Sequence, residues 1–135
     1  MLFDEKDKEI LELLKQNARV SNTKIAKKVN LSEGAVRNRI NRFVKEKIIT
    51  HFTIDLSIGA YFAILMAKAK DDTKKMMSEI SNLHITKDAY EISGEYDSCL
   101  ILEGNSLEEI DRKVDAIRKL RNVVETRTFL SFRRW

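Results

Sequence analysis

The stretch LSEGAVRNRINRF, residues 31–43, decides how the first third of this chain folds. Ser32 can cap a helix, because its hydroxyl accepts hydrogen bonds from the free backbone amides of a first helical turn. At about 100° per residue, the apolar residues that follow fall on one side of that helix: Val36, Ile40, Phe43 and Val44. The spacing predicts an amphipathic helix that begins after Ser32 and ends near Lys47.

The other side of this predicted helix is polar and cationic. It carries Gly34, Asn38, Asn41, Arg42 and Lys45, with Arg37 and Arg39 on the flanks. Glycine lowers helix propensity by about 1 kcal/mol relative to alanine, so Gly34 indicates that another molecule approaches closely. With Gly34 and Ala35 in its first turn, the helix suits the major groove of DNA, where Asn and Arg bond to purine edges.

Two shorter helices are predicted before this one. Asp4 is a suitable N-cap for a first helix that ends near Asn17, and Ser21 or Asn22 can cap the second. A tight connection at residues 30–31 then leads into the third helix. Three short helices with a tight turn between the last two are typical of a helix-turn-helix.

The positive charge of the chain is concentrated in this region. The formal net charge is +4, but residues 1–50 carry 12 Lys and Arg against 7 Asp and Glu, while residues 51–135 carry 13 against 14. A basic first third indicates an anionic partner, and double-stranded DNA is the partner predicted here. The alternative is an arginine-rich helix face that is merely solvated.

The predicted DNA-binding residues lie on the second and third helices. We expect the start of the third helix to contact base edges. Phosphates are expected to bind Arg39, Arg42, Lys45 and the lysines of the second helix. The predicted set is Ser32, Glu33, Gly34, Ala35, Arg37, Asn38, Arg39, Asn41 and Arg42, with Lys24, Lys27 and Lys28.

From Ile48 the apolar period changes from helical to two, which predicts a half-buried strand through Leu56. The rest of the chain alternates in type: strand 61–69, helix 73–83, strand 87–93, turn 94–97, strand 98–104, helix 106–120 and strand 122–132. This β-α-β-β-α-β order predicts a ferredoxin-like antiparallel sheet with both helices on one face. The fold class is therefore α+β, with a helix-turn-helix domain at 1–47, a hinge strand or linker at 48–60, and a ferredoxin-like domain at 61–135.

The strands of the predicted sheet are apolar on both sides. Because the helices cover only one face, a second subunit is the natural cover for the other. The sequence therefore predicts an obligate homodimer.

Other classes of site find little support in the sequence. One cysteine, Cys99, forms neither an internal disulfide nor a thiolate cluster, and His51 and His84 lack the spacing of metal ligands. No apolar run is long enough to span a membrane, and the N-terminus lacks the features of a signal peptide. We expect a cytoplasmic protein with no membrane association, no metal, no cofactor and no catalytic site.

The chain resembles the Lrp/AsnC, or feast/famine, family of transcriptional regulators. The resemblance rests on FDEKDKEILELL, on ARVSNTKIAKKVNLSEGAVRNRINRF, on IITHFTIDLSIGA, and on GEYD followed by VVETRTFLSF, in that order. One departure is Lys47 in KEKIIT, where the family usually has glycine, which concerns the local turn after the third helix.

This resemblance implies a winged-helix-like DNA reader joined to a ferredoxin-like dimerisation and effector domain. It also implies dimers, often assembled into octamers, and an amino-acid effector. The matching effector positions are Gly94, Glu95, Tyr96 and Asp97 in the turn, with Thr126 and Thr128 on the last strand. A carboxylate such as Asp97 can hold an α-ammonium group, although a plain hairpin turn with an interface acid explains the same residues.

Two rival functions stay open at this point. Some Lrp-like proteins resemble siroheme decarboxylases, so an enzyme on the same fold is one rival, against which stands the intact basic helix. The other is an architectural protein that compacts DNA with little base preference and no effector. We expect a regulator that binds pseudo-palindromic operators as a dimer or larger oligomer, and no enzymatic activity.

Overall fold

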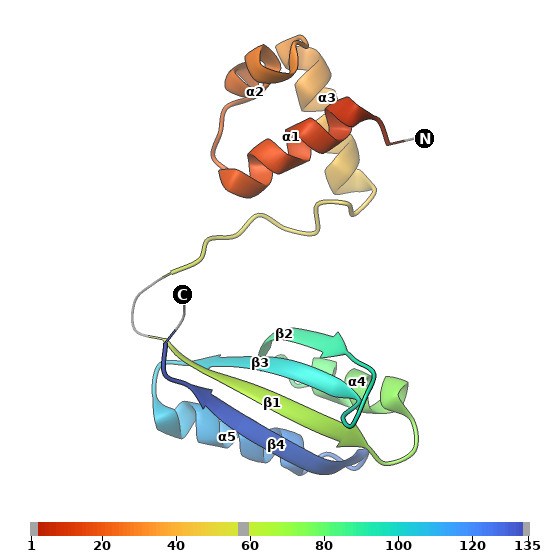
Figure 1. The fold of residues 1–135 in the computed structure, drawn as a ribbon, viewed down its shortest axis with the longest axis vertical. Helices are drawn as coiled ribbons and strands as arrows, with labels where there is room; N and C mark the ends of the chain where they lie inside the picture. Colours follow the sequence, from red (N-terminus) through yellow and green to blue (C-terminus); the bar gives the residue numbers. More distant parts are fainter. Residues whose placement is uncertain (1–2, 57–59, 134–135) are drawn as a thin grey trace. The chain divides into compact units, whose positions relative to one another are not determined.

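Three helices form the first of two compact units, which are divided after Leu56 (Figure 1). The computed structural model describes residues 3–56 and 60–133. The helices are α1 (Glu5–Gln16), α2 (Asn22–Val29) and α3 (Glu33–Lys45). None of the helices in the described ranges is long and apolar enough to cross a membrane.

Each helix of the first unit begins at the residue that its sequence predicts. The Asp4, Ser21 and Ser32 side chains accept hydrogen bonds from the backbone amides of Asp7, Lys24 and Ala35. Such caps satisfy amides that lack a partner inside the helix, and each contributes about 1 kcal/mol. The predicted starts of the three helices are therefore confirmed.

Apolar side chains from all three helices form one core in this unit. Burying each large side chain stabilises the fold by roughly 1.5–3 kcal/mol. Val44, which was expected on the buried side of α3, is instead 47% exposed. The core residues are Ile10, Leu14, Ile25, Ala26, Val29, Val36 and Phe43.

The predicted strand at 48–56 is absent from the structure. The described residues from Thr50 to Leu56 form neither helix nor strand, and Phe52, Ile54 and Leu56 are 54%, 72% and 57% exposed. A strand is held by hydrogen bonds to a neighbouring strand, and this segment is paired with none in the described parts of the chain. Residues 57–59 of the predicted linker lie outside the described residues.

The second unit is the expected antiparallel sheet with two helices. Its elements are β1 (Tyr61–Ala69), α4 (Thr73–Asn82), β2 (Thr86–Glu91), β3 (Ser98–Gly104), α5 (Leu107–Arg118) and β4 (Val123–Ser131). The strand order is β2-β3-β1-β4, and every neighbouring pair is antiparallel. This order confirms the ferredoxin-like prediction.

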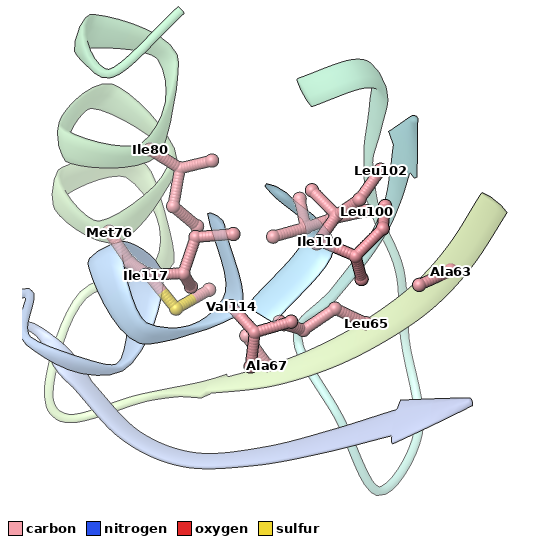
Figure 2. Packing of buried hydrophobic residues seen from close by; sticks show 10 residues of the cluster. All are labelled: Ala63, Leu65, Ala67, Met76, Ile80, Leu100, Leu102, Ile110, Val114 and Ile117. Carbon is pink, nitrogen blue, oxygen red and sulfur yellow. The ribbon is translucent and has the colours of Figure 1, made fainter. Parts of the chain in front are cut away.

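Both helices pack on the same face of the sheet. Side chains from β1, β3, α4 and α5 meet in one core (Figure 2), whose members are Ala63, Leu65, Ala67, Met76, Ile80, Leu100, Leu102, Ile110, Val114 and Ile117. The alternate residues of β1 and its neighbours point to the opposite, uncovered face. There Ile64 lies between Ile101 of β3 and Phe129 of β4, and Ile64 and Phe129 are 39% and 51% exposed.

A strained residue follows the end of α3. Lys47 has a φ of 57°, in the left-handed region. The amide of Ile48 donates to the Phe43 carbonyl at 2.8 Å, and the amide of Lys47 donates to the Val44 carbonyl at 3.1 Å. This is the hydrogen-bond pattern of a Schellman C-cap, a position that favours glycine because glycine has no Cβ.

We expect Lys47→Gly to stabilise the first unit. Relief of the left-handed strain should raise its free energy of unfolding by roughly 1 kcal/mol, measured from helical circular dichroism during chemical denaturation. Asn30 is the matched control, because it ends α2 with a φ of 56° and asparagine tolerates that conformation. An equal gain for Asn30→Gly and Lys47→Gly would contradict the explanation.

Candidate nucleic-acid interface

One face of α3 is exposed and polar. Gly34, Arg37, Asn38, Asn41 and Lys45 are exposed, whereas Val36 and Phe43 on the opposite side are buried. Ser32 and Glu33, at the start of the helix, are exposed as well, and Ala35 is half-buried. The structure thus brings most of the predicted base-reading residues together on one continuous surface.

Gly34 has no packing role within the unit. A Cβ built on Gly34 would meet no atom within 4 Å, and its φ lies outside the left-handed region. Neither the space around it nor its backbone conformation therefore requires glycine, although glycine costs the helix about 1 kcal/mol. Gly34 thus leaves the first turn of α3 open to the close approach of another surface.

The lysines of α2 lie on the solvent side of that helix. Lys24, Lys27 and Lys28 are exposed, while Ile25, Ala26 and Val29 point into the core. Flexible ammonium groups in such positions suit phosphate oxygens, which attract any compact positive charge. Arg37, on the flank of α3, pairs with Glu33 at 2.9 Å, but both side chains stay about half exposed.

Arg39 and Arg42 are held inside the unit by α1. Arg39 Nη1 lies 2.6 Å from Asp7 Oδ1 and 2.7 Å from Asp4 Oδ2, and Arg42 Nη2 lies 2.6 Å from Asp7 Oδ2. The Arg39 and Arg42 side chains are only 25% and 20% exposed, and Asp7 is fully buried. We call this arrangement of Asp4, Asp7, Arg39 and Arg42 the α1–α3 clamp.

The clamp keeps the Asp7 carboxylate ionised. Burial alone would raise the pKa of Asp7, but the hydrogen bond from the Asp4 amide and the pairs with Arg39 and Arg42 outweigh burial and lower it. The hydrogen bond from Arg39 also lowers the pKa of Asp4, and the same contacts raise the pKa of Arg39. The sequence predicted that Arg39 and Arg42 contact DNA phosphates, whereas in the structure both arginines pair with carboxylates inside the unit.

The sequence placed Asp7 only in the first turn of α1, three residues after the N-cap Asp4, and did not predict its pairing with Arg39 and Arg42. A signal for it existed, because Asp7 stands three residues before Ile10 and seven before Leu14, within the apolar stripe of α1. An acid in such a stripe is buried and requires a cation. The sequence does not show which cation, since Arg39 and Arg42 lie more than thirty residues further along the chain.

The predicted effector turn is tied to the sheet. Gly94 has a φ of 132°, which suits glycine. The Asp97 carboxylate accepts a hydrogen bond from the Ala69 amide at 2.8 Å, and the Asp97 amide donates to the Ala67 carbonyl at 3.0 Å. Asp97 therefore has a structural role in closing the turn against β1, while Glu95 is exposed.

The other effector positions divide between the two faces of the sheet. The buried Tyr96 donates its hydroxyl hydrogen to Glu125 Oε1 at 3.0 Å and stacks under Arg127, both on the uncovered face. Thr126 and Thr128 pair with the buried Ala67 and Leu65 and so point to the helix side. There Thr126 Oγ1 accepts from Arg118 Nε at 3.2 Å. The structure does not bring the two threonines and the turn onto one surface.

Comparison with known proteins agrees with the architecture of both units. A family described as winged helix-turn-helix DNA-binding matches residues 3–50. The HTH-type transcriptional regulator LysM of Saccharolobus solfataricus is 36% identical, over 98% of this chain and 96% of its own length. This chain belongs to the Lrp/AsnC family of transcriptional regulators.

Solved structures place the whole Lrp/AsnC chain in the same fold. LrpC of B. subtilis is 25% identical with a TM-score of 0.77, and the alignment covers 100% of this chain and 98% of LrpC. A feast or famine regulatory protein from M. tuberculosis, complexed with L-methionine, has a TM-score of 0.84 at 18% identity, covering 99% of this chain and 95% of that one. The predicted fold class and family are confirmed, and this Lrp/AsnC protein has a DNA-binding helix-turn-helix.

We expect Asp7→Asn to make the first unit less stable in a pH-dependent way. Because folding lowers the pKa of Asp7, its ion pairs contribute fully above the pKa of an unfolded aspartate, about 3.9, and are lost as the pH falls below it. At pH 7 the variant should be less stable by on the order of 3 kcal/mol. Chemical denaturation at several pH values should show this gap narrowing below about pH 4.

Glu12→Gln is the matched control on the same helix. Glu12 pairs with Lys15 at 3.0 Å, but both side chains are mostly exposed, so its loss should change stability by less than about 1 kcal/mol. A gap between the wild type and Asp7→Asn that is the same at pH 7 and pH 3 would contradict an ionised clamp.

Proposed function

We propose that this Lrp/AsnC regulator is a sequence-specific DNA-binding protein that binds pseudo-palindromic operators as a dimer or larger oligomer. The observation that carries the proposal is the exposed face of α3, where Asn38, Asn41 and Lys45 follow a glycine that the unit itself does not need. The wall of a DNA groove can approach the helix closely at Gly34. The side-chain amides of Asn38 and Asn41 can bond to purine edges.

The exposed polar residues of α2 and α3 divide into two roles in this proposal. Asn38, Asn41 and Arg37 read base edges, because amides and guanidinium groups bond to purines in directional pairs. Lys24, Lys27 and Lys28 contact phosphates, which fix the position of the protein and carry no sequence information. Ser32, Glu33 and Ala35 line the approach of the first turn to the groove.

The uncovered face of the sheet supports assembly. Ile64, Ile101 and Phe129 form an apolar row across β3, β1 and β4 on the side that α4 and α5 do not cover. A second copy that packs its own row on this one removes both from water, as in a two-fold homodimer. Two recognition helices related in this way reach half-sites about one helical turn apart, which gives the operator its pseudo-palindromic form.

An amino acid is the proposed effector. A relative of the same fold is complexed with L-methionine, and the turn at Gly94–Asp97 offers the exposed carboxylate of Glu95 for an α-ammonium group. Because Thr126 and Thr128 point to the helix side of the sheet, we propose the turn with Tyr96 as the effector-binding region and leave the threonines out of it.

Substitutions in the two classes should affect binding differently. Asn38→Ala should weaken binding to the preferred operator and leave other sequences bound as before, because the lost contact reads a base. Lys27→Ala should weaken binding to all sequences and reduce the slope of log K against log[salt] by about 0.9. Fluorescence anisotropy with operator and scrambled duplexes at several salt concentrations measures both effects.

The outcome that would contradict the division of roles is an equal loss on operator and scrambled DNA for both variants. Binding with no preferred sequence in the wild type would instead support an architectural, DNA-compacting protein. Failure of the wild type to bind any duplex would remove the DNA-binding proposal altogether.

We expect Phe129→Glu to convert the dimer to a monomer, because a charge in the apolar row would be buried without a partner. Size-exclusion chromatography with light scattering at micromolar concentration measures the mass. Leu107→Glu is the control, since Leu107 is 49% exposed but lies at the start of α5, in the helix layer. A wild-type monomer, or loss of the dimer in both variants, would contradict assembly through the uncovered face.

A further inference from the structure

We propose that Asp7 is a positioning residue for base reading: through the α1–α3 clamp it sets the rotation of α3 about its own axis and withdraws Arg39 and Arg42 from the DNA phosphates. The inference rests on the proposed function, in which α3 reads bases. It assigns a role in recognition to a buried residue of α1, a helix that carries none of the proposed DNA contacts.

The geometry of the clamp is suited to fixing a rotation. Arg39 and Arg42 stand three residues apart and therefore share one flank of α3. Each takes a different oxygen of one carboxylate, Arg39 the Oδ1 and Arg42 the Oδ2 of Asp7, both at 2.6 Å. Asp4, the N-cap of α1, holds Arg39 a second time at 2.7 Å. Two attachments on the same flank resist a turn of α3 in either direction.

The carboxylate is itself fixed in place. Asp7 Oδ2 also accepts the Asp4 amide at 3.1 Å, and the Asp7 amide donates to Asp4 Oδ1 at 2.8 Å, so the first turn of α1 locks the acid. Asp7 is fully buried, which leaves it no room to follow a moving arginine. The rotation of α3 is therefore fixed relative to α1 and to the core that α1 shares with α3.

Small rotations matter on the reading face. Side chains of a helix extend to about 5 Å from its axis, so a turn of roughly 20° moves the tips of Asn38 and Asn41 by about 2 Å. Hydrogen bonds to base edges do not survive such a displacement, because donor and acceptor must stay within about 0.5 Å of their best separation. Contacts to phosphates through flexible lysines tolerate it.

The clamp also decides which cations face DNA. A phosphate that took Arg39 or Arg42 would remove one of the two cations that pair with the buried Asp7 carboxylate, which is unfavourable. The two arginines therefore stay on α1, and the phosphate contacts fall to the exposed lysines. This assignment reverses the sequence-based expectation for Arg39 and Arg42.

The test measures specificity and salt dependence together in the full-length protein. Asp7→Asn keeps the shape of the side chain but removes the charge that holds both arginines. We expect the ratio of operator to scrambled-DNA affinity to fall at least tenfold. We also expect the slope of log K against log[salt] on scrambled DNA to steepen, by up to about 0.9 for each arginine that reaches a phosphate.

Two further variants separate this role from stability and from overall charge. Glu12→Gln removes one negative charge from the same helix and should change neither quantity. Arg42→Gln leaves Asp7 paired with Arg39, and should lower the specificity ratio without changing the salt slope. All measurements are made at a temperature where circular dichroism shows each variant fully folded, and Arg42→Gln carries the test if Asp7→Asn does not fold.

Three results would overturn the inference. The first is an unchanged specificity ratio in folded Asp7→Asn. The second is a salt slope that falls by about 0.9 in Arg42→Gln with the ratio unchanged, which would make Arg42 a phosphate contact. The third is an equal effect of Glu12→Gln. A wild type without any preferred sequence would be recognisable separately, because it removes the proposed function before any variant is compared.

Discussion

The proposed DNA-reading surface of this protein is built around one buried carboxylate. Asp7 stands in the apolar stripe of α1, where an unpaired charge would be strongly unfavourable, and it is accommodated because Arg39 and Arg42 reach it from α3. The pairing orients the recognition helix, since the flank that faces α1 is fixed and the face with Gly34, Asn38 and Asn41 must then lie outward. The buried ion pairs of Asp7 and the exposed polar face of α3 both follow from this orientation of α3.

In the second unit, too, the contacts on one side determine which residues face outward, here through apolar residues. Alternation along β1 sends Ala63, Leu65 and Ala67 to the helices and Ile64 to the other side. Burial against α4 and α5 accounts for one face only. The apolar row on the uncovered face has no role within one subunit, just as Gly34 has none within the first unit. We propose a partner for each feature, a second copy in one case and a DNA groove in the other.

Local signals in the sequence predicted the elements well. The capping residues Asp4, Ser21 and Ser32 located the helices of the first unit, and the alternation of strand and helix patterns after residue 60 located the sheet, because these signals act over a few residues. What the sequence did not show concerns contacts that are distant or external. The period of two in residues 48–56 indicated a strand, but a strand requires a neighbour that alternation cannot supply. Arg39 and Arg42 were assigned to DNA phosphates from their charge and their place on α3, since nothing nearby in the sequence reveals Asp7 as their partner. Thr126 and Thr128 were grouped with the turn at 94–97, and only the register of β4 against β1 shows that they face the helices.

The most direct test of sequence-specific recognition is the selection of bound duplexes from a random library at physiological salt, with and without a mixture of the twenty amino acids. The account predicts enrichment of a pseudo-palindromic motif whose half-sites lie about one helical turn apart, and a change in that enrichment when amino acids are present. Bound DNA without any enriched motif would contradict the central claim that the exposed face of α3 reads bases.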